Sequence, residues 1–477
     1  MMKAYLGKLI KTYICVGVLI IGDMGALVSS LLVAFFIRSW MLVKVIPLFD
    51  PIVHGLGIYL ESWIIIFLWP LAFAYEGVYP SIGISFWEEL KSVYKGNFFA
   101  FIAVIILTFI TKTTIQFSRP VILFAFIMSI LMLPLFRRIM RSLLKLSGLW
   151  TRDIILVGNR DNVKQVMCNI RKHPDWGLHP IGAVTVEGKG DLQGLPVLGP
   201  IDQLEHIDTK AHEVIVTMPG ASPKELVSIV ERATHLSPII KVLPDLYGLA
   251  SAGIRTHDLD GMLLLEIEDR LAQKENRIIK RIFDLACSIF GILVLLPLFL
   301  VVALLIKAES KGPVVFSHGR VGKGGREFRC YKFRTMVADA QKVLQDLLAR
   351  DPQARAEWDR DFKLKNDPRI TRIGSFLRRT SLDELPQLIN VLKGEMSLVG
   401  PRPIVLEEVD RYGDKARYFF KVTPGITGLW QVSGRNDISY EERVLLDEYY
   451  AKNWSLWLDI EIIIRTFGAV FKKDGAY

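Results

Sequence analysis

Two adjacent carboxylates, Asp383 and Glu384, lie in the stretch "RTSLDELPQL" and precede a short apolar pattern. The apolar residues at positions 385, 388, 389 and 392 have the spacing of one face of a helix. Pro386 has no N–H group to donate, so it fits only the first turn of that helix, which we expect to begin near residue 382 or 383. Both carboxylates would then lie at the positive end of the helix, close in sequence to Arg378 and Arg379, and would be held ionised.

This acid pair has two interpretations. Ser381 and Glu384 have the spacing of a capping box, and capping is the commoner reason for acidic residues in a first helical turn. The nearby arginines exceed what a cap requires, however. An ionised carboxylate can attack a phosphorus atom when cations offset its repulsion from the phosphate oxygens, so the pair is also a candidate catalytic site.

A second stretch, "HGRVGKGGREFRCYKFRTM" (318–336), combines four glycines with several cations, among them Arg320, Lys332 and Arg334. Glycines let a backbone approach a ligand closely, and the cations suit phosphate oxygens. The stretch lacks the Gly-Lys-Ser/Thr ending of a P-loop. Taken alone, it would be interpreted as a solvated basic hairpin.

Two more stretches follow the acid pair. In "GPRP", prolines on both sides of Arg402 stiffen the chain, which reduces the freedom that this arginine loses when it binds a phosphate. The turn-rich loop "TPGITGLWQVSGRN" contains Arg435. After it, "NWSLWLDIEIII" (453–464) predicts a helix at a membrane interface, with Asp459 interrupting its apolar pattern, and a buried core helix is an equal alternative.

The composition favours a membrane protein that also has aqueous domains. The chain has 477 residues, 51% of them hydrophobic, and a formal net charge of +10. Its lysines and arginines fall beside apolar segments and around the acid pair, which favours lipid and phosphate as partners and not nucleic acid. Its four cysteines are scattered without a C-x-x-C pair, so neither a disulfide framework nor a zinc site is expected.

Four apolar segments, at about 13–37, 52–75, 98–111 and 120–135, predict a four-helix transmembrane bundle over residues 1–147. Lysines precede the first segment and a cluster of arginines follows the fourth, so both ends of the bundle are expected on the cytoplasmic side. The helices are not expected to hold a relay of buried charge.

From Thr151 onward, strand and helix patterns alternate, which predicts a parallel, doubly wound sheet in a Rossmann-like cytoplasmic domain over 148–265. Gly158 follows the first strand, but the other glycines of a dinucleotide fingerprint are missing. A packing or dimerisation module is therefore favoured over a nucleotide-binding one.

The apolar run from Ile282 to Ile306 has basic residues at both ends and Pro297 inside it. A spanning helix would place those two basic clusters on opposite sides of the membrane. We therefore expect a re-entrant helix, over 279–308, that breaks near Pro297 and returns to the same side, with the Ser288 hydroxyl as one possible partner for the freed carbonyls. A spanning helix with a proline kink is the alternative.

Three stretches, "YKFRTM", "RRTSLDELPQLINVLKGEMSLVGPRP" and "TPGITGLWQVSGRND", resemble the bacterial sugar transferase domain of monotopic polyprenyl-phosphate phosphoglycosyl transferases. The resemblance covers the catalytic domain, placed at 275–477, and the earlier parts look like those of the larger bacterial members. It implies a membrane helical bundle, an α/β Rossmann-like domain and an α/β catalytic domain with a re-entrant helix. One departure is Leu296 before Pro297, where many relatives have Ser-Pro.

The resemblance also implies a two-step reaction. Asp383 would attack the β-phosphorus of a UDP-hexose, release UMP and carry the sugar phosphate until undecaprenyl phosphate accepts it. Glu384, together with Asp383, would hold Mg²⁺. The resemblance assigns phosphate binding to Lys332, Arg378 and Arg402, and nucleotide binding to Arg435. Asp459 matches an acidic family position that is needed for activity.

The expected product is the first intermediate of a repeat unit of O-antigen, capsule or exopolysaccharide. The protein is expected in the bacterial inner membrane as a homodimer, with its catalytic domain on the cytoplasmic face. Galactose is the expected sugar, since the resemblance is to galactose-transferring members. Two alternatives remain: the same reaction with UDP-glucose, and a non-catalytic membrane scaffold for polysaccharide export.

Overall fold

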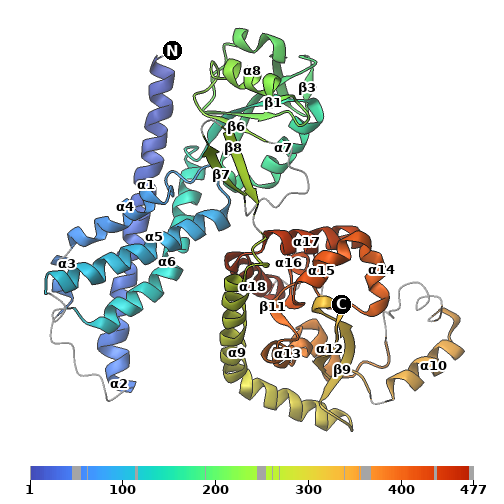
Figure 1. The fold of residues 1–477 in the computed structure, drawn as a ribbon. Coiled ribbons are helices and arrows are strands. Elements are labelled where there is room, and N and C mark those ends of the chain that lie inside the picture. Colours follow the sequence, from blue (N-terminus) through green and yellow to red (C-terminus); the bar gives the residue numbers. More distant parts are fainter. Residues whose placement is uncertain are drawn as a thin grey trace. The chain divides into compact units, whose positions relative to one another are not determined.

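The computed structural model describes residues 2–45, 55–61, 63–112, 117–188, 190–243, 254–259, 262–267, 269–337, 339–353, 355, 367–434 and 438–471. The predicted site residue Arg435 lies outside this described part. The chain divides into two compact units, Met1–Leu246 and Tyr247–Tyr477. Figure 1 shows the elements of each unit.

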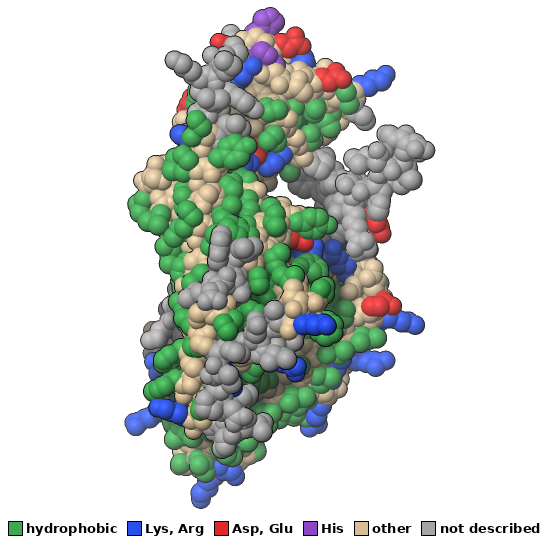
Figure 2. All heavy atoms as spheres, turned by 90° about the vertical axis from the view of Figure 1, so that its left-hand side faces the viewer, with side chains coloured by type: hydrophobic (Ala, Val, Ile, Leu, Met, Phe, Trp, Pro, Cys, Tyr) green, Lys and Arg blue, Asp and Glu red, His purple; other side chains and the backbone are tan. Residues whose placement is uncertain are grey.

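The first unit begins with long apolar helices. Three are long and apolar enough to cross a membrane: α1 (Met2–Phe36) with its continuations η1 (Ile37–Leu42) and α2 (Val43–Val45), α5 (Phe86–Ile110) and α6 (Arg119–Leu146). Their outward side chains include Ile21, Phe109 and Leu131, which are 69%, 77% and 63% exposed. Figure 2 shows hydrophobic side chains over much of the visible face. Such apolar faces suit contact with lipid.

The second apolar segment is not one helix. Its described part forms α3 (Leu56–Glu61), the 3₁₀ helix η2 (Trp63–Phe67) and α4 (Leu68–Tyr75). Pro70 lies in the first turn of α4, where a proline is readily accommodated because the N–H groups of that turn have no partner within the helix. The described part of this segment is therefore three short helices, where the sequence predicted one long helix.

The helices of the first unit bury a cluster of charges that the sequence did not indicate. Arg137 on α6 donates to Asp23 on α1 at 2.7 and 2.5 Å and to Glu89 on α5 at 2.8 Å. Arg141 also donates to Glu89. All four side chains are buried, and the two acids balance the two arginines, which ties the three helices together.

The rest of the first unit is a six-stranded sheet in the order β3-β4-β2-β1-β5-β6, and every pairing except that of β3 with β4 is parallel. Its strands are β1 (Arg152–Gly158), β2 (Leu178–Thr185), β3 (Asp191–Leu192), β4 (Leu195–Pro200), β5 (Glu213–Thr217) and β6 (Ile240–Val242). Its helices are α7 (Arg160–Lys172), η4 (Pro174–Trp176), η5 (Ile201–His206) and α8 (Pro223–Ala233).

Alternate residues of β1 point to the two faces of this sheet and enter two different hydrophobic cores. Ile154 and Leu156 pack with α7, whereas Ile155 and Val157 pack with α8 and η5. Gly158 has a packing reason, because a Cβ there would lie 2.1 Å from the carbonyl oxygen of Thr217 on the neighbouring strand β5. This close approach accounts for the lone glycine without a nucleotide.

The described part of the second unit contains the two-stranded sheets β7–β8, β9–β10 and β11–β12 together with helices. Its strands are β7 (Ile254–Leu259), β8 (Met262–Ile267), β9 (Val315–Val321), β10 (Glu327–Phe333), β11 (Ser397–Val399) and β12 (Gly425–Thr427). Its α-helices are α9 (Lys274–Glu309), α10 (Ala340–Arg350), α12 (Arg372–Arg379), α13 (Gln387–Lys393), α14 (Val409–Tyr412), α15 (Ala416–Lys421), α16 (Leu429–Ser433), α17 (Tyr440–Asn453) and α18 (Leu456–Phe471). Short 3₁₀ turns are η6 (Lys323–Gly325), η7 (Leu382–Glu384), η8 (Leu406–Glu408) and η9 (Gly413–Lys415).

Helix α9 does not break at Pro297, contrary to the prediction, because its 36 residues form one helix that includes this proline. Figure 1 shows that α9 changes direction partway along its length, which is the usual response of a helix to an internal proline. The Ser288 hydroxyl is buried and makes no hydrogen bond within the described part of the chain, so it does not partner a freed carbonyl.

Both ends of α9 contact the same unit. Near its start, Arg281 donates to the carbonyl oxygens of Val391 and Leu392 at the end of α13. At its other end, the Glu309 carboxylate accepts from the backbone N–H of Arg372 at 2.8 Å, at the start of α12. The two halves of α9 therefore rest on one compact body.

Candidate active site

The acid pair lies in the 3₁₀ turn η7, ahead of helix α13. The predicted α-helix start near residue 382 is wrong, because α13 begins only at Gln387. Pro386 cannot donate the hydrogen bond that would close an α-helical turn onto residue 382, and Leu385 N–H instead bonds to the Leu382 carbonyl at 3.3 Å. The capping box is also absent: Ser381 adopts a left-handed conformation, with φ at +55°, and its side chain makes no cap hydrogen bond.

Three chain segments meet at the acid pair. Lys332 on β10 donates from Nζ to Glu384 Oε1 at 2.6 Å, and the same nitrogen lies 4.0 Å from Asp383 Oδ2. Arg402, between its two prolines, lies with Nη2 3.5 Å from Glu384 Oε1. The structure thus brings together four of the predicted site residues.

The two carboxylates have opposite pKa shifts. Burial, and then the charge of Glu384, raises the pKa of Asp383 above its usual value, despite Lys332 and Arg378. Burial alone would also raise the pKa of Glu384, but the charges of Arg402 and Lys332 hold that pKa below its ordinary value. We expected the helix position and the nearby arginines to lower the pKa of Asp383, and the shift has the opposite direction because that expectation neglected burial. A more basic carboxylate is the better nucleophile once it is ionised.

Two further arginines add positive charge here. Arg378 donates from Nε to the Thr335 hydroxyl at 3.0 Å, and its charge acts on Asp383. The charge of Arg320 on β9 acts on Glu384, and burial followed by the neighbouring charge of Arg402 lowers the pKa of Arg320 itself. The third cation of that stretch, Arg334, lies elsewhere and donates to the backbone at the end of α9.

Asp459 does not join this group. Its side chain is fully buried and accepts from Lys280 Nζ at 2.7 Å, the Tyr450 hydroxyl at 2.7 Å and Trp454 Nε1 at 3.1 Å. A carboxylate enclosed in this way has no surface to offer a substrate, so Asp459 lies apart from the acid pair and contacts buried side chains instead. Its surroundings also favour the core-helix interpretation for the start of α18, although Phe467 near its end is 64% exposed.

Asn390 on α13 is a residue that the sequence interpretation missed. Its buried side chain donates to the Arg329 carbonyl at 2.7 Å and to Glu395 Oε2 at 2.6 Å, and accepts from Tyr331 N–H at 3.0 Å. These bonds fasten β10 to α13, which places Lys332 opposite the acid pair. A polar residue in an otherwise apolar short helix was the available signal.

The acid pair fits one mode of Mg²⁺ binding. Within the described residues, no three His, Cys, Asp or Glu side chains are grouped to hold a metal ion. Mg²⁺ that serves phosphate substrates commonly uses one or two carboxylates and completes its coordination with water and phosphate oxygens. Asp383 and Glu384 offer such a pair, although Glu384 Oε1 already accepts from Lys332.

Comparison with protein families identifies the class of protein to which this chain belongs. The Bacterial sugar transferase family matches residues 275–473, and a family described as a CoA-binding domain matches residues 74–244, which includes the sheet and part of the helices before it. The first range holds the acid pair and all the cations around it.

Individual relatives agree. The chain is 40% identical to a UDP-galactose-lipid carrier transferase of Erwinia amylovora and to an undecaprenyl-phosphate galactose phosphotransferase of Salmonella typhimurium, in each case over 82% of this chain and 83% of the relative. It is 31% identical to a UDP-glucose:undecaprenyl-phosphate glucose-1-phosphate transferase of Xanthomonas campestris pv. campestris, over 80% of both chains. The chain therefore belongs to the bacterial sugar transferase family and is a transferase.

Proposed function

We propose that the chain transfers hexose-1-phosphate from a UDP-hexose to undecaprenyl phosphate and releases UMP, as the first step of a polysaccharide repeat unit. The observation that carries this proposal is the acid pair facing Lys332 and Arg402 in a chain 40% identical to such transferases. Galactose is the proposed sugar, because the relatives named for galactose are more similar than those named for glucose, at 40% against 31% and 30%.

In the proposed first step, an Asp383 oxygen forms a bond to the β-phosphorus of the donor. The bond between that phosphorus and the bridging oxygen breaks, and UMP leaves with the electron pair. In the second step, an oxygen of undecaprenyl phosphate attacks the same phosphorus and Asp383 leaves as a carboxylate. Lys332 and Arg402 lie where they can stabilise the charge on the phosphoryl oxygens. When bound by Asp383 and Glu384, Mg²⁺ would neutralise part of that charge.

We further propose that α9 enters the membrane and returns to the same, cytoplasmic side. Support comes from the contacts of Arg281 and Glu309, since a helix whose two ends rest on one aqueous body cannot place those ends across a bilayer. The cytoplasmic side is proposed from the basic residues that flank the apolar run. Labelling of single cysteines introduced at Lys274 and Lys311 in intact cells tests this, and outside labelling of either would refute it.

The domain limits 1–147, 148–265 and 275–477 are also proposals, as is two-fold assembly through the Rossmann-like domain. Light scattering of the detergent-solubilised protein tests the assembly, and a monomer mass would refute it.

Replacement of Asp383 by Asn tests the central proposal, because it keeps the shape of the side chain and removes the nucleophile. We expect UMP release from UDP-galactose, and sugar transfer into lipid, to fall to background while the variant still accumulates in membranes. Retained turnover would refute the role of Asp383. Membranes supplied with UDP-glucose and UDP-galactose separately decide the sugar, and no turnover with any UDP-sugar in the wild type would support a non-catalytic scaffold.

A further inference from the structure

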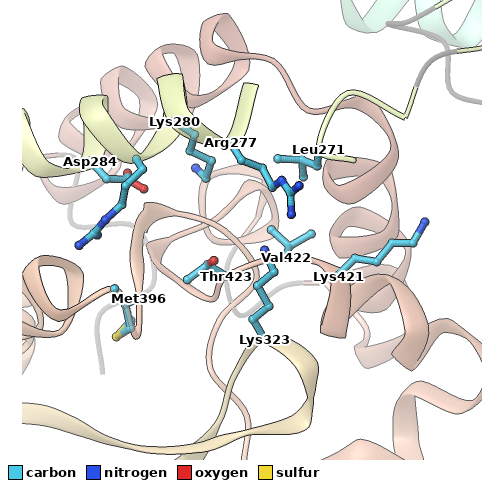
Figure 3. Close-up of a pocket in the computed structure, with 11 residues that line it drawn as sticks. Leu271, Arg277, Lys280, Asp284, Lys323, Met396, Lys421, Val422 and Thr423 are labelled. Carbon is cyan, nitrogen blue, oxygen red and sulfur yellow. The ribbon is translucent and has the colours of Figure 1, made fainter. Parts of the chain in front are cut away.

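A cavity of about 190 Å³ lies in the second unit among the start of α9, the turn of the β9–β10 hairpin and the segment after α15. Figure 3 shows the side chains that line it. The charged ones are five cations and a single acid: Arg277, Lys280, Arg281, Lys323, Lys421 and Asp284. None of them contacts Asp383 or Glu384, so the cavity is separate from the acid pair.

Most of these charges already have partners. Lys280 is paired with Asp459 at 2.7 Å, and Lys421 with Asp269 at 3.0 Å. Arg281 donates to two backbone carbonyls of α13, and Asp284 accepts from Leu398 N–H at 3.1 Å. These contacts satisfy the wall of the cavity without any ligand.

Arg277 and Lys323 differ from the other charged residues of the cavity in their contacts. Figure 3 shows their side chains pointing toward each other from α9 and from the hairpin turn, and neither has a hydrogen bond or an ion pair to any residue in the described part of the chain. Burial, and then the charge of Arg277, lowers the pKa of Lys323. Two converging cations repel each other, and an anion between them would turn this repulsion into attraction.

The cavity also offers a neutral donor. Thr423 is one of its lining residues, and its hydroxyl makes no hydrogen bond to the residues that the structure describes. Two cations and a hydroxyl that converge on a small space match the oxygens of a phosphate group.

The surroundings indicate where such a phosphate comes from. Ile278 and Ile282, on the same stretch of α9 as Arg277, are 58% and 61% exposed, and the apolar run of α9 continues from there. A soluble phosphate makes no use of an apolar surface, whereas a lipid phosphate carries acyl chains that cover one.

We propose that this cavity binds the phosphate group of an anionic membrane lipid, held by Arg277, Lys323 and Thr423 at the base of α9. The site is distinct from the reaction of the proposed function, because it shares no residue with the acid pair and its cations. Its role is to anchor the start of α9 at the lipid surface.

The test is calorimetric titration of the full-length protein, in a nonionic detergent, with three probes: dioctanoyl phosphatidylglycerol, dioctanoyl phosphatidylcholine and inorganic phosphate. We expect the wild type to bind phosphatidylglycerol more tightly than either of the others. The double variant Arg277→Gln, Lys323→Gln should weaken that binding at least about tenfold, as expected from the loss of two charge-assisted contacts. The matched control is Lys307→Gln, Lys311→Gln, which removes the same charge at the other end of α9 and should bind as the wild type does.

Equal binding of inorganic phosphate would overturn the lipid source, and equal weakening in the control would show that only net charge matters and would overturn the site. Should the double variant fail to fold, Thr423→Val is the substitute and should weaken binding roughly threefold. UMP release by both variants in membranes should stay at the wild-type level, which separates a failure of this site from a failure of the proposed function.

Discussion

The two units of this chain each gather acids and bases from distant segments, but they do so in opposite ways. In the first unit, Asp23 and Glu89 face Arg137 and Arg141, all four are buried, and the charges balance. In the second unit, Asp383 and Glu384 face an excess of cations, and the side chains of Lys332 and Arg402 are 30% and 45% exposed. A closed and balanced cluster holds helices together, whereas an open cluster with surplus positive charge has capacity left for an anion.

The largest effect is expected from breaking the closed cluster. Arg137→Met would leave two buried carboxylates without their main partner, which typically costs about 3–5 kcal/mol. We expect a large drop in the temperature at which the detergent-solubilised protein loses its folded fraction, with turnover per folded molecule unchanged. Arg138→Met, at the exposed neighbouring position, is the control and should leave that temperature nearly unchanged.

Breaking the open cluster should lower the reaction rate and leave the thermal stability nearly unchanged, the reverse of the result expected for the closed cluster. Lys332→Met removes a cation that the proposed mechanism uses to stabilise the phosphoryl oxygens, and losses of about 10²–10³ in rate are typical for such a group. We expect UMP release to fall by that factor with little change in thermal stability. Arg329→Met on the same strand is the matched control. A rate that falls equally in both variants would mean that the charge of β10, and not the position of Lys332, matters.

Asn390→Ala tests the support beneath the open cluster. It would leave the Tyr331 N–H and the Arg329 carbonyl without their partner, at a cost of about 1–3 kcal/mol. Because Lys332 would lose its position, we expect a lower rate at saturating UDP-sugar with a smaller change in KM. Unchanged kinetics in a destabilised protein would restrict Asn390 to a structural role.

The smallest expected effect concerns how Asp383, the proposed nucleophile, changes the stability of the fold. Folding raises the pKa of Asp383, so the folded state binds its proton more tightly, and stability falls as pH rises from the unfolded pKa through the folded one. Asp383→Asn should therefore be at least as stable as the wild type at neutral pH, and the difference should shrink as the pH is lowered. A clear loss of stability at neutral pH would contradict the direction of this pKa shift.

Local patterns predicted the elements well where they were long or strongly periodic. The alternation of β1, α7, β2, β5, α8 and β6 was correct. Strands β3 and β4 were missed, because β3 has only two residues and β4, "LPVLGP", is interrupted by prolines and a glycine. The second apolar segment looked like one helix because hydropathy averages over Pro70. The helix start at the acid pair was placed too early because Pro386 cannot donate the hydrogen bond to the residue 382 carbonyl, so a 3₁₀ turn precedes α13.

The sequence predicted which residues belong to the candidate site better than it predicted how they are arranged. Lys332, Asp383, Glu384 and Arg402 meet as the motifs indicated, yet the same kind of reasoning included Asp459, which is enclosed by Lys280 and Tyr450. A motif shows that an acid is needed, but it does not show whether its partner is a substrate or another side chain.

By itself the sequence determined the type of the long, periodic elements, the apolar character of the long helices and the residues available for phosphate chemistry, because these depend on side chains close together along the chain. Only the tertiary structure decided which charges meet: Lys332 lies 52 positions from Glu384, Arg137 lies 114 from Asp23, and Lys280 lies 179 from Asp459. The energy of a charge depends on its burial and on the distance to every other charge, and both quantities exist only once the chain is folded.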